Sequence, residues 1–222
     1  DSDTEGTGAA RKWLKAAYEE IAKTSGGRLT VALQTAMVPC RRRGMPRQIE
    51  VVNVIATLRG TSDPDRIYVV GGHYDSRNGR GEDGVNLAPG AVDDASGTAV
   101  AMEACRVLST REFAATIVFV AYDGEEQGLL GSKAHAQQMA ADDAAVDGMI
   151  TCDIVGNTLG QNGQIVADRV RVFSEGIRFS EDAKANLTRR AIGGEDDGPS
   201  RALAKKMTTL YKLSEQQLTK QH

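Results

Sequence analysis

The chain lacks a long apolar run, an excess of charge of one sign, and paired cysteines. No apolar stretch approaches the ~20 residues that cross a bilayer, so we expect no membrane span. The 27 basic and 30 acidic residues leave a net charge of −3, which argues against nucleic acid or an anionic membrane as the main partner. Cys40, Cys105 and Cys152 form no CxxC pair, so they predict buried thiols or at most one disulfide.

What is present is the composition of an ordinary globular domain. Hydrophobic residues make up 41% of the 222 positions and charged residues 26%, which permits a sizeable core. No internal repeat or interdomain linker is visible, so we expect residues 1–222 to form a single domain. Residues 1–8 are polar and include no initiator Met. This pattern is typical of a processed end, and it leads us to expect a secreted or periplasmic protein.

Apolar residues alternate along the chain between helical spacing and strand-like runs. Short, nearly continuous apolar runs predict strands that are buried on both faces. The order of elements predicts an α/β fold of three layers, with a mostly parallel mixed central sheet and helices on both faces. We expect helices at 7–23, 96–108, 130–139 and 199–212, strands at 29–39, 48–59, 67–72, 116–122 and 149–152, and a surface loop at 175–198.

Acidic residues and one histidine follow the predicted buried strands. His73 ends one strand, Glu125 and Glu126 follow the next, and Asp153 follows the third. Asp93 stands just before a predicted helix. Because ligands of open α/β sheets lie at the carboxyl ends of the strands, we expect these side chains to converge on one site. Carboxylates with an imidazole are the ligands of a zinc site.

His73 and the two aspartates before the helix each have a structural interpretation and a functional one. Zinc-bound histidines usually donate their second ring N–H to an oxygen, and Asp75 offers one two residues away. The alternative for His73 is a histidine satisfied within the core. Asp94 is equally well explained as the N-cap of the helix, whereas Asp93 has one carboxylate oxygen for each of two metal ions.

The adjacent pair Glu125 and Glu126 favours function most strongly. Neighbouring carboxylates repel each other unless a cation lies close to them. One of the two can bind a metal ion while the other remains free as a general base. A solvated acidic turn is the alternative, and the apolar residues on both sides weaken it. Asp153 follows a buried strand, where an unpaired carboxylate is disfavoured.

Taken together, these residues resemble the co-catalytic two-zinc aminopeptidases, a family that includes the bacterial leucyl and Streptomyces-type enzymes. The resemblance covers about residues 48–157 and rests on four segments in order, at 71–76, 90–97, 123–126 and 151–153. It implies a single zinc-peptidase-like catalytic domain of the phosphorylase/hydrolase-like fold. It also implies a metal-activated water that hydrolyses the N-terminal bond of a peptide with a free N-terminus. The roles it implies are zinc ligands at His73, Asp93 (bridging), Glu126 and Asp153, a general base at Glu125, a partner of His73 at Asp75, and support of the bridging turn by Asp94.

The scarcity of histidine is the departure from this family, which has a further histidine near its C-terminus that binds the same metal ion as Glu126. The chain has three histidines in all. His135 falls in the predicted helix 130–139, where we expect an exposed side chain, and His222 is the last residue of a polar tail. We therefore expect a C-terminally truncated chain that lacks its last strands and its last metal-binding histidine, so that one zinc site is incomplete.

Two alternatives remain open. A glutaminyl-cyclase-like enzyme with a single zinc ion has a similar pattern around His73, Asp93 and Glu125. A catalytically degenerate, peptidase-like binding domain would keep the fold and lose the chemistry. The number of zinc ions bound per chain distinguishes the three interpretations, because they require two, one and none.

Overall fold

The computed structural model describes residues 4–41, 46–79, 83, 85–160, 162–176, 181–196 and 198–218. Its contacts divide the chain into two compact units, Asp1–Ile165 and Val166–His222. That division does not test whether the units fold separately, so the single domain over residues 1–222 stays a prediction. Among the described residues, no helix is both long enough and apolar enough to span a membrane.

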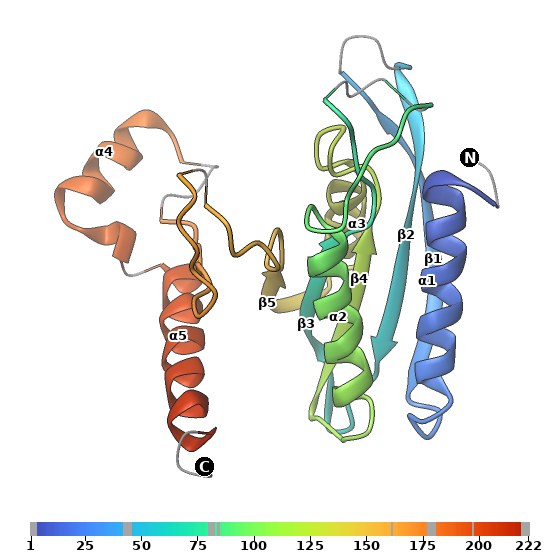
Figure 1. Cartoon of the computed structure of the whole chain (residues 1–222). Helices are drawn as coiled ribbons and strands as arrows, with labels where there is room; N and C mark the ends of the chain where they lie inside the picture. Colours follow the sequence, from blue (N-terminus) through green and yellow to red (C-terminus); the bar gives the residue numbers. More distant parts are fainter. Residues whose placement is uncertain are drawn as a thin grey trace. The chain divides into compact units, whose positions relative to one another are not determined.

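The first unit is built on a mixed sheet of five strands in the order β1-β2-β4-β3-β5 (Figure 1). β1 and β2 are the two strands expected at 29–39 and 48–59; they pair antiparallel to each other, and β2 is also antiparallel to β4. β3 is parallel to both β4 and β5, so the carboxyl ends of these three strands lie at one edge. The strands are β1 (Leu29–Pro39), β2 (Gln48–Leu58), β3 (Asp63–His73), β4 (Ala115–Tyr122) and β5 (Ala145–Thr151).

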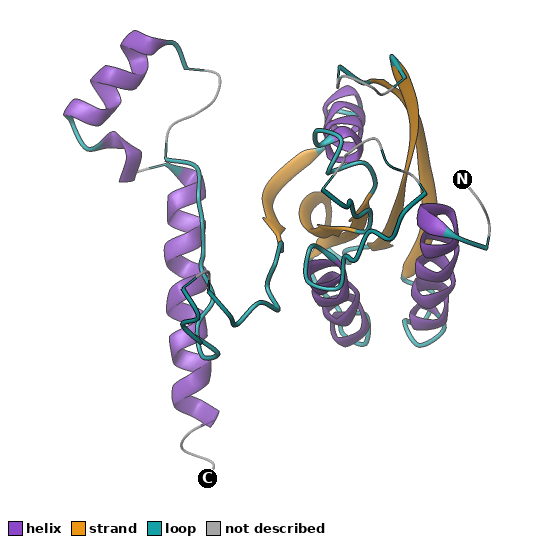
Figure 2. Ribbon diagram, turned by 45° about the horizontal axis from the view of Figure 1, so that its top comes forward, coloured by secondary structure: helices purple, strands orange, loops and turns teal. Residues whose placement is uncertain are grey.

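Helices cover both faces of this sheet, as predicted. α1 (Gly6–Ala22) and α2 (Ala95–Leu108) lie along one face, and α3 (Leu130–Ala141) lies on the other (Figure 2). The alternation of side chains along a strand explains this division. On β4, Phe119 packs with the core beneath α1 and α2, whereas Val120 packs on the opposite side, toward α3. The three-layer α/β architecture therefore follows from period-two alternation in the central strands.

The strand predicted at 149–152 differs from the expectation because it is not buried on both faces. β5 is an edge strand that pairs with β3 alone. Its apolar side chains are partly in solvent, with Val146 42% and Met149 44% exposed. The apolar run at 149–152 correctly indicated a strand, but it carries no information on how many neighbours that strand has.

The cysteines agree with the prediction of thiols in part. All three are free, and Cys40 and Cys105 are buried. Burial raises the pKa of the Cys105 thiol, which keeps that side chain unreactive. Cys152 lies just past β5 and is only half-buried.

In the second unit the predicted loop at 175–198 is wrong. It contains the helix α4 (Ala183–Ala191) and a 3-10 turn, η1 (Gly194–Asp196). The Asp182 carboxylate accepts a hydrogen bond from the Ala185 N–H at 2.8 Å and caps the start of α4. None of the residues of α4 is buried, and Leu187 is its only large apolar side chain, so the sequence gives little apolar signal for a helix here. The last helix, α5 (Pro199–Leu218), is confirmed.

The start of α3 packs so closely on β2 that we predict a large effect from one added methyl group. A Cβ at Gly131 would lie 2.3 Å from both the Asn53 side-chain oxygen and the Asp123 carbonyl oxygen. Gly131→Ala should therefore lower the free energy of unfolding by about 1–3 kcal/mol, although alanine is the better helix former. Denaturant unfolding measures this difference. Gly79→Ala is the control, because a Cβ there meets nothing within 4 Å, and equal stability of the two variants would contradict the prediction.

Candidate metal centre

The carboxyl ends of β3, β4 and β5 meet at one cavity. His73, the last residue of β3, pairs with Tyr122 at the end of β4, and Gly71 pairs with Thr151 at the end of β5. This register brings the residues that follow each strand to the same edge. A cavity of about 370 Å³ opens there, and its lining includes His73, Glu125 and Asp153 together with Gly72, Tyr122, Leu129, Ser132, Met149, Thr151 and Cys152.

His73 is buried, and its two ring nitrogens have different surroundings. Nδ1 lies 3.0 Å from the Asp75 carbonyl oxygen. Because a carbonyl oxygen only accepts, Nδ1 carries the hydrogen in this contact. Nε2 is buried without a hydrogen-bond partner among the described residues, at 3.2 Å from Asp93 Oδ1 and 3.9 Å from Glu125 Oε2. A buried nitrogen that faces carboxylate oxygens and has no hydrogen-bond partner fits a metal ligand.

The protonation of His73 agrees with a site that is built for a cation. Burial acts to lower the pKa of this imidazole, but the hydrogen bond with Asp75 and the negative charge of that residue outweigh it and raise the pKa to about 9. The ring therefore holds a proton at neutral pH when no metal ion is bound. A metal ion that binds Nε2 displaces this proton, as is general for histidine ligands.

Asp75 fixes the loop that carries the two glutamates. Its side chain is buried, and its two oxygens accept the backbone N–H groups of Glu125 at 3.0 Å and Glu126 at 3.1 Å. The same carboxylate lies 3.5 Å from His73 Nδ1. Sequence reasoning assigned Asp75 to His73 alone and missed its contact with the glutamate backbone, because no spacing pattern indicates which loop a buried carboxylate will reach.

Asp94 lies within the cluster but already uses its oxygens. Single ligand atoms of His73, Asp94 and Asp153 all lie within 4.8 Å of one another. However, the Asp94 carboxylate accepts backbone hydrogen bonds from His73 at 3.1 Å, from Gly97 at 2.9 Å and from Ile154 at 3.2 Å. These contacts cap α2 and join it to the ends of β3 and β5. They favour the supporting role that the sequence predicts over direct binding of a metal ion.

The two glutamates have different partners. Burial raises the pKa of Glu125, and the nearby charge of His73 acts against that rise. Glu126 is nearly buried, and its Oε2 lies 2.7 Å from the Nε of Arg77. The structure thus brings His73, Asp93, Glu125 and Asp153 to one point and places Glu126 beside an arginine that sequence reasoning did not consider. The predicted roles of these residues as ligands and base stay predictions.

The prediction that His135 is exposed is wrong. Its side chain is buried, and its Nδ1 lies 3.1 Å from the Tyr122 hydroxyl. The reason is that α3 packs this side of the helix onto the sheet, beside the buried Ala134. Burial lowers the pKa of the His135 imidazole. Within the described part of the chain, His135 does not join the cluster around His73, and His222 lies outside the described residues.

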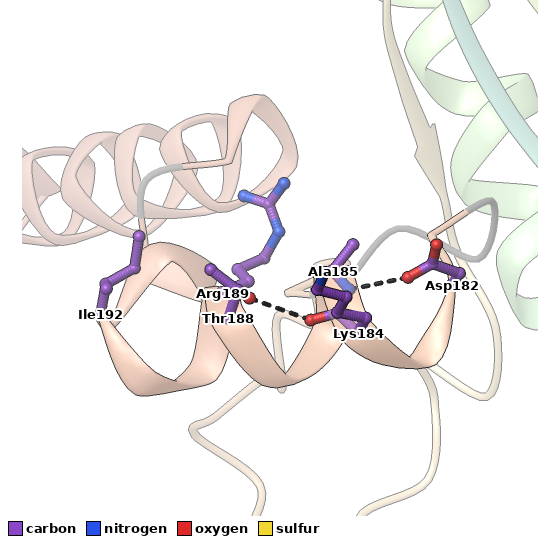
Figure 3. A pocket seen from close by; sticks show the side chains of 6 residues that line it. All are labelled: Asp182, Lys184, Ala185, Thr188, Arg189 and Ile192. Atoms are coloured by element: carbon purple, nitrogen blue, oxygen red, sulfur yellow. Dashed lines mark hydrogen bonds between the residues drawn. The ribbon is translucent and has the colours of Figure 1, made fainter.

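A second cavity lies in the other unit and lacks the chemistry of a metal site. It measures about 410 Å³ and opens along α4 (Figure 3). The two hydrogen bonds drawn there join Asp182 to Ala185 and Thr188 to Lys184, so they belong to the helix itself. The lining contains one carboxylate and no histidine: Asp182, Lys184, Ala185, Thr188, Arg189 and Ile192. We therefore place the candidate site at the cavity of His73.

Comparison with known proteins agrees with a metal site at this cavity. The sequence model of peptidase family M28 matches residues 53–186, more than half of the chain. A probable zinc metalloprotease of Leptosphaeria maculans is 43% identical over 205 residues, which cover 92% of this chain and 47% of that protein. A probable zinc metalloprotease of Pyricularia oryzae is 45% identical over 210 residues, which cover 91% and 40%. The chain thus spans less than half the length of these curated relatives.

Solved structures show the same fold. The Legionella pneumophila LapA aminopeptidase superposes with a TM-score of 0.50 and 27% identity, over 68% of this chain and 37% of its own. The glutaminyl cyclase of Porphyromonas gingivalis gives a TM-score of 0.53 with 23% identity, over 66% and 52%, and at that identity the likeness concerns the fold alone. The α/β fold with a mixed central sheet is confirmed by both.

We predict that His73 and His135 respond differently to the same substitution. His73→Ala removes the buried Nε2 that faces the carboxylates, so the variant should bind zinc at least about tenfold more weakly. His135→Ala should keep the zinc content of the unmodified chain, because its ring contacts Tyr122 instead. Metal analysis by mass spectrometry after dialysis at fixed free zinc measures both. Equal zinc contents in the two variants would refute the assignment of His73.

Proposed function

The chain belongs to peptidase family M28, and from this premise we propose that it carries the catalytic machinery of a zinc-dependent aminopeptidase. The observation that carries the proposal is the buried Nε2 of His73, which has no hydrogen-bond partner among the described residues and faces Asp93 and Glu125. Metal ligands would be His73, Asp93 and Asp153 at one position, with Asp93 and Glu126 at a second. The names of the curated relatives support zinc as the metal.

When bound, zinc ions would polarise the scissile carbonyl and make a water molecule more acidic. Glu125 accepts the proton of that attacking water and then donates it to the leaving amine. The raised pKa of Glu125, which comes first from burial, makes it a stronger base than a glutamate on the surface. Its backbone N–H is held by Asp75, so the base keeps a fixed position relative to the ring of His73.

The substrate we propose is a peptide with a free N-terminus. The α-amine of such a peptide would be held beside the metal ions, among the carboxylates of Asp93, Glu125, Glu126 and Asp153. An amine held there leaves the first peptide bond next to the base. The similarity to an aminopeptidase at 27% identity supports this choice.

The glutaminyl-cyclase-like alternative shares the fold and the pattern around His73, Asp93 and Glu125, but the paired glutamates favour the peptidase. Two adjacent glutamates with their backbones anchored on one carboxylate suit a division of labour between a ligand and a base. A degenerate binding domain is the weaker alternative, since it has no need of an acidic cluster around a buried histidine.

We predict that Glu125→Gln separates catalysis from metal binding. The variant should retain its zinc but lose activity by about 10²–10⁴-fold, because it removes the proton acceptor and little else. Release of nitroaniline from aminoacyl-nitroanilides measures the rate, and mass spectrometry measures the metal. Glu103→Gln is the matched control, since this exposed glutamate of α2 pairs with Arg106 away from the cluster. Activity of Glu125→Gln equal to that of the control would rule out the assigned role.

A further inference from the structure

Arg77 brings a permanent positive charge to the acidic cluster. It stands four residues after His73, in the loop that leaves β3. Its Nε lies 2.7 Å from Oε2 of Glu126, the distance of a charge-assisted hydrogen bond. The Arg77 side chain is 48% exposed and that of Glu126 only 10%, so the guanidinium reaches inward from solvent to a carboxylate that is nearly buried.

Both ends of Glu126 are held by this loop of β3. The Asp75 carboxylate accepts the backbone N–H of Glu126 at 3.1 Å, and Arg77 contacts the carboxylate of the same residue. Ser76, which lies between them, donates its hydroxyl to the Ala88 carbonyl oxygen at 2.7 Å and anchors the loop. The arginine is therefore brought to Glu126 by a loop whose two preceding residues, Asp75 and Ser76, are both fixed by hydrogen bonds.

The guanidinium of Arg77 opposes the binding of a divalent cation at Glu126. The charge of arginine is not removed at any ordinary pH, and it repels another cation a few ångströms away. The ion pair also occupies one of the two oxygens that Glu126 offers. By contrast, His73 Nε2 has no hydrogen-bond partner among the described residues and faces Asp93. The two halves of the cluster thus differ in how ready they are to bind a metal ion.

We propose that Arg77 competes with the second zinc ion for Glu126 and so makes that position weaker than the one at His73. The inference rests on the proposed function, because it takes Glu126 as a zinc ligand. When one ion is bound, Arg77 neutralises Glu126 and holds it in place. When the concentration of free zinc is high enough, a second ion displaces the Arg77 side chain from Glu126. Arg77 then moves into the solvent that already surrounds half of it.

The test compares Arg77→Met with the unmodified chain in titrations with Zn²⁺ alone. Methionine keeps much of the length of the side chain and removes its charge. The variant should bind the second ion at least about tenfold more tightly, or bind two ions where the unmodified chain binds one, with the first ion unchanged. Calorimetry gives the two affinities, and mass spectrometry after dialysis at fixed free zinc gives the number of ions.

Arg66→Met is the matched control. Arg66 is also 48% exposed, and its Nε lies 2.9 Å from Asp147 Oδ2 at the far end of the pairing of β3 with β5. This variant loses a similar ion pair and should bind zinc as the unmodified chain does. Arg77→Lys, which keeps the charge, should restore most of the difference between the two affinities.

The outcomes separate this inference from the proposed function. Second-ion binding by Arg77→Met that is unchanged or weaker would overturn the role of Arg77, while binding of the first ion would still support the metal centre. Tighter binding in Arg66→Met as well would also overturn it, since the effect would then be one of general charge. No zinc in any of the proteins would overturn the proposed function, and the role of Arg77 with it.

Discussion

The site depends on the Asp75 carboxylate, which joins the ends of two parallel strands. The pairing of β3 with β4 ends at His73 and Tyr122, and one more backbone hydrogen bond follows it, from the Tyr74 N–H to the Tyr122 carbonyl oxygen. Beyond that bond, Asp75 joins the strand ends by accepting two consecutive N–H groups of the loop after β4. Its own carbonyl oxygen accepts the hydrogen of His73 Nδ1. One residue therefore sets the ring of the histidine and the backbone of both glutamates in a common frame.

The carboxylates around this frame fall into two groups that differ in how their charge is balanced. Asp75 and Asp94 accept backbone N–H groups, and so does Asp123, which accepts from Val52 at 2.9 Å. Such bonds replace the water that a buried carboxylate has lost. Asp93 and Glu125 instead approach the single nitrogen of His73 Nε2. The first group, which accepts backbone N–H groups, holds the site together. The second group, Asp93 and Glu125, is available to interact with a cation.

Much of the fold could be predicted from the sequence because the central strands carry their own burial pattern. The runs at 67–72 and 116–122 are apolar on both faces, and this follows from helices that cover both sides of β3 and β4. α4 could not be found in this way, since none of its residues is buried. His135 was misjudged for a related reason: a histidine in a helix does not tell which side of that helix packs on the sheet, and here the packed side holds it.

The candidate ligands could be predicted as a set because all except Asp93 lie at or just past the end of a strand, and parallel strands end together. Their relative readiness for metal could not, because it depends on an arginine four residues from the histidine whose reach is a matter of loop geometry. In the sequence Arg77 is one basic residue among 27. In the structure it divides the acidic cluster into a half at His73, where the proton of the ring leaves when a metal ion binds, and a half at Glu126, which is paired with the permanent charge of an arginine. The two metal positions that we propose therefore differ in the charges that the protein places around them, before any ion is bound.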